Sequence, residues 1–93
     1  MGEDLRRLLE EGVRVAFGTQ AELARFVATH HVSPSLAQLL MALRLTFRSS
    51  VDALAWLDHR MSAVGGTPFE LIANGEAARV VRALSTYRGL ATA

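Results

Sequence analysis

Residues 65–71 read Gly-Gly-Thr-Pro-Phe-Glu-Leu, and this stretch specifies how the last third of the chain folds. Thr67 with Glu70 three residues later is a capping box, in which each side chain satisfies a free backbone amide at a helix start. Pro68 stands at the first helical position, where its missing amide hydrogen costs nothing. The two glycines free the backbone for a sharp turn. The sequence therefore predicts a turn, a short helix that breaks at Gly75, and a final helix.

Apolar residues recur at intervals of three and four along the rest of the chain, which is the spacing of amphipathic helices. The expected helices run from about Glu3 to Phe17, from the Thr19–Glu22 capping box to about Ala28, from the Ser33 cap to about Phe47, from Ser49 or Ser50 to about Met61, from Pro68 to Gly75, and from about Glu76 to Tyr87. The fourth of these is expected to bury Leu54, Trp56 and Leu57. No segment alternates with the period of a strand, so the sequence predicts an all-α bundle of about five to six helices.

Length and composition favour one small domain that binds a partner protein or a second copy of the chain. The chain has 93 residues, of which 51% are hydrophobic, a high fraction for a small monomer. Part of this surplus is expected to face a partner or a second copy of the chain. The weakest boundary lies near Arg48, and it separates a helical N-terminal region, residues 1–48, from a helical C-terminal region, residues 49–93.

The absence of some residue types excludes several classes of protein. The chain has no cysteine, which excludes disulfides, thiolate zinc sites and thiol nucleophiles. No apolar run approaches the roughly 20 residues of a membrane span. The acidic start at Glu3 and Asp4 is not followed by a secretion signal, so a cytoplasmic location is expected.

The distribution of charge singles out the C-terminal region. The net charge is +1, which does not by itself predict a nucleic-acid partner. All ten basic residues are arginine, a side chain suited to carboxylates and phosphates, although a GC-rich genome also explains this choice. The last acidic residue is Glu76, and residues 77–93 carry a charge of +3. This cluster is either a partner-binding surface or a solvated helix end whose cations complement the helix dipole.

The titratable residues show no arrangement typical of an active site. Asp58 and His59 are adjacent on a predicted helix and therefore point in different directions. His30 and His31 are neighbours in a predicted turn, without other ligands at metal spacing, so a turn-surface role is favoured over a metal site. We expect a protein that is not an enzyme, with no catalytic residue, cofactor or metal.

The N-terminal region has a pattern similar to the start of a helix-turn-helix. The run from Thr19 to Ala24, followed by Val32 and Ser33, would place the helix that begins at Ser33 in the major groove of DNA. The residues facing DNA would then be Gln20, Ser35, Gln38 and Arg44. A recognition helix normally carries base-reading residues at its exposed N-terminal positions, whereas the only basic residue here comes late. A degenerate or dimerising scaffold is therefore the favoured interpretation.

The C-terminal region carries an ordered set of motifs. An alanine-rich helix ends in Trp-Leu, a Gly-Gly-x-Pro-x-Glu-Leu-Ile turn and short helix follow, and a Gly-Glu step leads to a helix with spaced Val and Leu. The matching residues are Ala53, Ala55, Trp56, Leu57, Gly65, Gly66, Pro68, Glu70, Leu71, Ile72, Gly75, Glu76, Val80, Val81 and Leu84. This set, covering about 40 of the 93 residues from about Val51 to Leu90, resembles the toxin-binding domain of the MbcA/ParS/Xre antitoxin family.

The resemblance implies an antitoxin of a type II toxin–antitoxin pair. Members of the family bind a RES-domain toxin, an enzyme that consumes NAD or transfers ADP-ribose, and cover its active-site cleft with their C-terminal domain. Many also repress their own operon through an N-terminal helix-turn-helix. The partner-binding residues that the resemblance and the charge pattern imply are Trp56, Gly66, Pro68, Glu70, Arg79, Arg82, Tyr87 and Arg88.

Two other interpretations of the sequence stay open. One is a small helical DNA-binding transcriptional regulator without a toxin partner, in which the N-terminal region acts on DNA. The other is a helical homo-oligomer, which would also account for the apolar surplus. We expect the chain to work as a homo-oligomer or, if it is an antitoxin, as a hetero-oligomer with its toxin.

Overall fold

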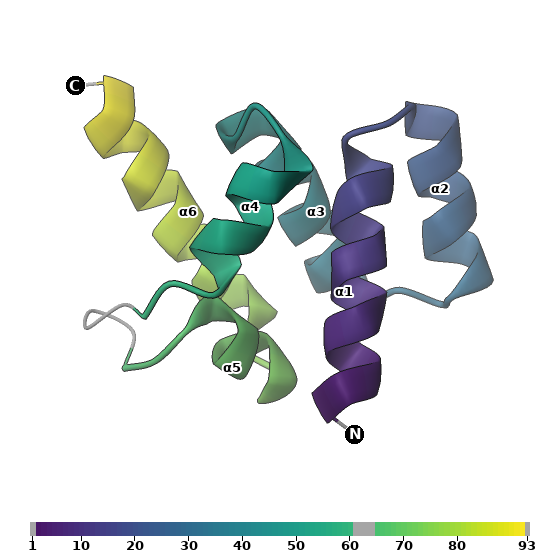
Figure 1. Ribbon diagram of the computed structural model, residues 1–93, viewed down its shortest axis with the longest axis horizontal. Coiled ribbons are helices and arrows are strands. Elements are labelled where there is room, and N and C mark those ends of the chain that lie inside the picture. The colour runs from purple at the N-terminus through teal and green to yellow at the C-terminus, as the bar shows by residue number, and fades with distance from the viewer. Residues whose placement is uncertain (1, 61–64, 93) are drawn as a thin grey trace.

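The computed structural model describes residues 2–60 and 65–92 of the chain, and these residues form six helices (Figure 1). The helices are α1 (Gly2–Ala16), α2 (Gln20–Thr29), α3 (Pro34–Thr46), α4 (Ser50–Leu57), α5 (Pro68–Ala73) and α6 (Ala77–Thr92). The described residues contain no strand, which confirms the predicted all-α fold. Within the same residues, no helix is both long enough and apolar enough to cross a bilayer.

Four of the helices begin at a hydroxyl side chain that caps the first turn. Thr19, Ser33, Ser49 and Thr67 each accept a hydrogen bond from the backbone N–H three residues later, at 3.1–3.2 Å. Such a cap satisfies one of the backbone donors that a helix start leaves without a partner. Of the two serines that the sequence offered for α4, Ser49 is therefore the cap.

The two predicted capping boxes differ in the structure. At α5 the box is complete, because the Glu70 carboxylate also accepts a bond from the Thr67 backbone N–H at 3.3 Å. At α2 the carboxylate of Glu22 instead accepts a bond from the hydroxyl of Thr19 at 3.0 Å. The predicted box at Thr19 is thus only half formed, because the Glu22 carboxylate bonds to the side chain of Thr19 and not to its backbone N–H.

The ends of two helices lie away from their predicted positions. The helix α4 ends at Leu57, with Asp58 as its C-cap, rather than near Met61, which lies outside the described residues. The carboxylate of Asp58 contacts Arg6 of α1, a distant interaction that helical periodicity does not reveal. The helix α6 continues to Thr92, past the predicted end at Tyr87, because a glycine such as Gly89 weakens a helix by only about 1 kcal/mol.

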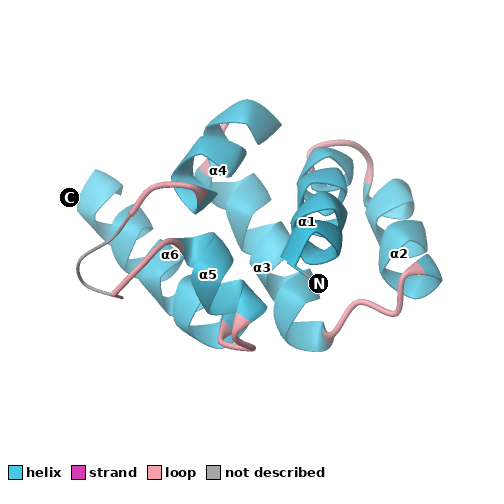
Figure 2. Cartoon of the chain, turned by 60° about the horizontal axis from the view of Figure 1, so that its bottom comes forward, coloured by secondary structure: helices cyan, strands magenta, loops and turns pink. Residues whose placement is uncertain are grey.

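The helix α3 lies at the centre of the molecule, with α1 on one side and α6 on the other (Figure 2). Its residues Leu39, Leu40 and Leu43 are at most 1% exposed. They belong to a single core to which all six helices contribute. Because α3 comes from residues 1–48 and α6 from residues 49–93, the two regions of the sequence pack against each other through this core. Leu54, expected inside, is only partly buried at its edge.

Removing a leucine from the centre of α3 is expected to destabilise the whole fold. Leu39→Ala should lower the free energy of unfolding by about 2–5 kcal/mol, because it leaves a cavity in a fully buried position. The neighbouring Gln38 is exposed, so Gln38→Ala should change the same quantity by less than about 0.5 kcal/mol. Urea unfolding followed by circular dichroism measures both, and equal stabilities for the two variants would contradict this packing.

Candidate functional site

Three aromatic rings from three different helical segments meet at one end of the core. Phe47 is the C-cap of α3, Trp56 lies in α4 and Tyr87 lies in the second half of α6. The ring centroids are 5.9 Å apart for Phe47 and Trp56, 5.7 Å for Phe47 and Tyr87, and 6.3 Å for Trp56 and Tyr87. These separations are typical of favourable aromatic packing. We call these three residues the aromatic triad.

The aromatic triad forms part of the wall of an open groove between α4 and the second half of α6. The groove has a volume of about 550 Å³. It is lined by Thr46, Phe47, Arg48, Asp52, Ala55, Trp56, His59 and Tyr87. Asp52, Ala55 and Trp56 lie in α4 and are spaced by three and four, which brings side chains to the same side of a helix, and His59 follows just beyond its end. The groove therefore has aromatic walls and carries both a cation, Arg48, and an anion, Asp52.

A second surface lies on the outer side of α6. Arg79 and Arg82 are exposed and are three residues apart, so they share one face of the helix. The guanidinium of Arg79 pairs with the Glu76 carboxylate at 2.9 Å, and no ion pair of Arg82 is found among the described residues. Tyr87 lies five positions beyond Arg82, in the second half of α6, and lines the groove. The structure thus separates it from the two arginines, and the side chain of Arg88 lies outside the described residues.

The residues of the C-terminal motifs around α5 are largely buried. Trp56 is 8% exposed, and Gly66 and Pro68 are also buried, so a partner could reach these three only through the surface that they support. A Cβ atom at Gly66 would lie 3.0 Å from the carboxylate of Glu70. This short distance favours a residue without a side chain at position 66. Gly65 has a φ of +79°, a conformation that glycine adopts without strain.

The exposed side chain of Glu70 has a structural role in the fold. Its carboxylate accepts the bond from the Thr67 backbone N–H and another from the Thr67 hydroxyl at 3.2 Å. The helix α5 contains only six residues, which is too short for backbone hydrogen bonds alone to hold it in water. The capping box and the burial of Phe69, Leu71 and Ile72 together account for its position.

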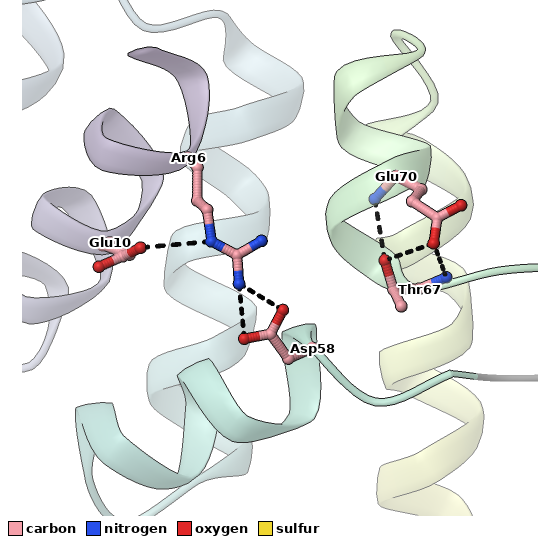
Figure 3. Close-up of polar contacts among 5 residues, drawn as sticks. All are labelled: Arg6, Glu10, Asp58, Thr67 and Glu70. Atoms are coloured by element: carbon pink, nitrogen blue, oxygen red, sulfur yellow. Dashed lines mark hydrogen bonds and ion pairs between the residues drawn. The ribbon is translucent and has the colours of Figure 1, made fainter. Parts of the chain in front are cut away.

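Arg6 of α1 links the connection between α4 and α5 to the N-terminal helix (Figure 3). One nitrogen of its guanidinium, Nη2, donates to both carboxylate oxygens of Asp58, at 2.5 and 2.7 Å. The same guanidinium lies 4.3 Å above the centre of the Phe69 ring, which is the geometry of a cation–π contact. Sequence reasoning did not identify this residue, because Arg6 and Asp58 are 52 positions apart and no local pattern joins them.

The four residues predicted to face DNA do not form a basic surface. Gln20, Ser35 and Gln38 are exposed at the start of α2 and in the first half of α3. Arg44 is only partly exposed, and its Nη1 is buried without a hydrogen-bond partner among the described residues. Leu39, Leu40, Ala42 and Leu43 of α3 are buried, and the exposed residues of this helix, Pro34, Ser35, Gln38 and Leu45, include no cation.

The described residues contain no group of three or more His, Asp or Glu side chains that could hold a metal ion. The ring of His30 packs on that of Phe26, with centroids 4.5 Å apart. The neighbouring His31 occupies a left-handed backbone conformation with a φ of 51°. These contacts give His30 and His31 roles in closing the turn between α2 and α3.

Comparisons of the chain with protein-family models, with curated proteins and with solved structures found no match in any of the three.

Removal of the complete capping box should cost more stability than removal of the half-formed one. Thr67→Ala removes the hydroxyl that caps α5 and that also holds the Glu70 carboxylate near the backbone N–H of residue 67. We expect the free energy of unfolding to fall by about 1–2 kcal/mol. Thr19→Ala should cost about 0.5–1 kcal/mol, because the longer α2 retains more of its own hydrogen bonds. Equilibrium urea unfolding of the two variants, measured side by side, would contradict this order if Thr19→Ala proved the more damaging.

The guanidinium shape of Arg6 should matter more than its charge. Arg6→Lys keeps the charge but removes the planar group that stacks on Phe69 and contacts both oxygens of Asp58. Since the pair is half exposed, we expect a loss of about 1 kcal/mol or less in the free energy of unfolding. Arg7→Lys is the matched control at an exposed neighbouring position, and the two variants should differ in thermal unfolding.

Proposed function

We propose that this chain is the antitoxin of a type II toxin–antitoxin pair and that it binds and blocks a RES-domain toxin in the cytoplasm. The main support is the outer face of α6, where Arg79 and Arg82 are exposed on a helix that contains no acidic residue. The ordered motifs from Val51 to Leu90, which resemble the antitoxin family, support the same function. The RES enzymes of that family consume NAD or transfer ADP-ribose, so such a partner has a cleft that handles a dinucleotide.

The outer face of α6 has the chemistry of a docking surface for a polar cleft. Arginine forms paired hydrogen bonds with carboxylates and is enriched among the residues that dominate binding energy at interfaces. Around Arg79 and Arg82 the exposed residues Ala78, Ser85 and Thr86 are small. A partner surface can therefore approach the helix closely while the two guanidinium groups reach past it to acidic side chains.

The motif residues that are buried support this surface from below. Pro68, Leu71 and Ile72 anchor α5 in the core, and α5 packs against the first half of α6. Val80 and Leu84, at most 1% exposed, hold the inner face of α6 on the same core. The helix backbone that carries the two arginines is therefore already ordered before binding, which favours affinity.

The exposed surface of α3 offers less support for the DNA-binding alternative. The exposed residues in the first half of this helix, Pro34, Ser35 and Gln38, include no cation. Proteins that bind DNA neutralise several phosphates with Lys or Arg, which makes their affinity fall steeply as salt increases. Repression of an operon by this chain alone is therefore not part of the proposal.

Reversal of the charge on the outer face of α6 should abolish binding to the toxin. The chain is co-expressed with the adjacent open reading frame, and complex formation is measured by pull-down and by rescue of growth. Arg79→Glu with Arg82→Glu should weaken the complex by about a hundredfold or more, since opposed like charges at an interface cost several kcal/mol. Growth rescue should be lost in parallel.

The matched control is Arg7→Glu with Arg14→Glu, which reverses two exposed arginines of α1 and should leave the complex intact. An unchanged complex with the α6 variant would overturn the assignment of this face. Failure of the neighbouring gene product to bind the wild-type chain, together with salt-dependent binding to DNA upstream of the gene, would instead favour the transcriptional regulator.

A further inference from the structure

Three large hydrophobic residues of the described chain are exposed, and they lie on or beside the corner between α3 and α4. They are Leu45, 70% exposed, Val51, 73% exposed, and Tyr87, 42% exposed. Leu45 and Val51 flank the short connection between α3 and α4, and Tyr87 lines the groove beside it. In Figure 1 this corner lies at the top of the molecule, next to the upper half of α6. Scattered single hydrophobic residues are normal on a surface, whereas a gathered set marks an interaction site.

The polar residues of the same corner carry opposite charges. Arg48 and Asp52 both line the groove, four positions apart, and each is exposed. Neither takes part in an ion pair among the described residues. A strongly acidic or strongly basic partner would gain from one of the two charges and be repelled by the other. A partner that presents one cation and one anion with the same spacing would match both.

A second copy of this chain presents that pair of charges. In a twofold symmetric interface every contact occurs twice: if residue i of one copy contacts residue j of the other, then residue j of the first copy contacts residue i of the second. Arg48 of one copy can then pair with Asp52 of the other, and the symmetry repeats the pair. The same operation brings the apolar residues of both corners, Leu45 and Val51, toward the dimer axis and removes them from water.

We propose that the corner between α3 and α4, together with the groove of the aromatic triad, is the homodimer interface of this protein. The interface is built from Leu45, Phe47, Arg48, Val51, Asp52 and Tyr87, with two symmetric Arg48–Asp52 ion pairs at its edge. It uses the second half of α6, which lies beyond Arg82, so a dimer leaves Arg79 and Arg82 of each copy open. This proposal does not depend on the proposed antitoxin function.

Paired charge reversals test the interface. Wild-type protein should dimerise in sedimentation equilibrium over a dilution series. Arg48→Asp alone and Asp52→Arg alone each place like charges opposite one another at two points, and each should raise the dimer dissociation constant at least tenfold. An equimolar mixture of the two variants restores both ion pairs between unlike chains, so the mixture should form heterodimers with nearly wild-type affinity.

The mixture also separates a lost contact from a folding defect. Asp52→Arg places a cation in the first turn of α4, where the helix dipole disfavours it, but an unfolded chain could not rescue its partner. Leu45→Asp with Val51→Asp should give monomers with an unchanged circular dichroism spectrum, while the charge reversal Arg7→Asp on α1 should leave the dimer intact. A monomeric wild-type protein, a dimer unaffected by these variants, or variants that fail to pair when mixed would each overturn the proposal.

Failure of this interface and failure of the antitoxin function are distinguishable. The Arg48 and Asp52 variants are expected to retain the toxin complex formed through α6, and the Arg79 and Arg82 variants are expected to retain the dimer. Loss of both properties in one set of variants would show that the two surfaces are not separate.

Discussion

Leu39, Leu40 and Leu43 of α3 are almost inaccessible to solvent, and helices from both halves of the chain pack against this one helix. A domain of this size buries only about three fifths of the surface that its unfolded chain exposes, so its core is small and each central leucine carries a large share of the stability. Because α1 and α6 contact α3 on different sides, neither region of the sequence has a core that is independent of the other. The positions of both proposed surfaces follow from this arrangement.

The C-terminal helix illustrates how one element serves two surfaces. Its inner face, with Val80 and Leu84, belongs to the core, and its outer face carries Arg79 and Arg82. Further along, Tyr87 joins Phe47 and Trp56 to form a wall of the groove. The rise of about 1.5 Å per residue separates these roles along the helix axis, since Tyr87 lies five positions beyond Arg82 and eight beyond Arg79. The proposed toxin surface and the proposed dimer interface can therefore coexist on α6.

The α4–α5 connection depends on contacts that bridge distant parts of the chain. Asp58 at the start of this connection and Phe69 at its end both contact Arg6. The capping box then sets the direction in which α5 leaves the connection. The contact between Arg6 and Asp58 is half exposed, so its value lies in geometry more than in energy. Arg6 thereby joins α1 to the end of α4 through Asp58 and to α5 through Phe69.

The sequence by itself determined the helices, because their causes are local. Apolar residues spaced by three and four marked the inner faces, and hydroxyl residues followed by proline or glutamate marked helix starts at Ser33 and Thr67. Only the tertiary structure decided between Ser49 and Ser50, ended α4 at Leu57, and placed Gly66 and Pro68 in the interior. It alone brought Phe47, Trp56 and Tyr87 together and paired Arg6 with Asp58. Such contacts join residues far apart in the chain, and their geometry depends on how whole helices pack. The local spacing of residues in the sequence does not predict this packing.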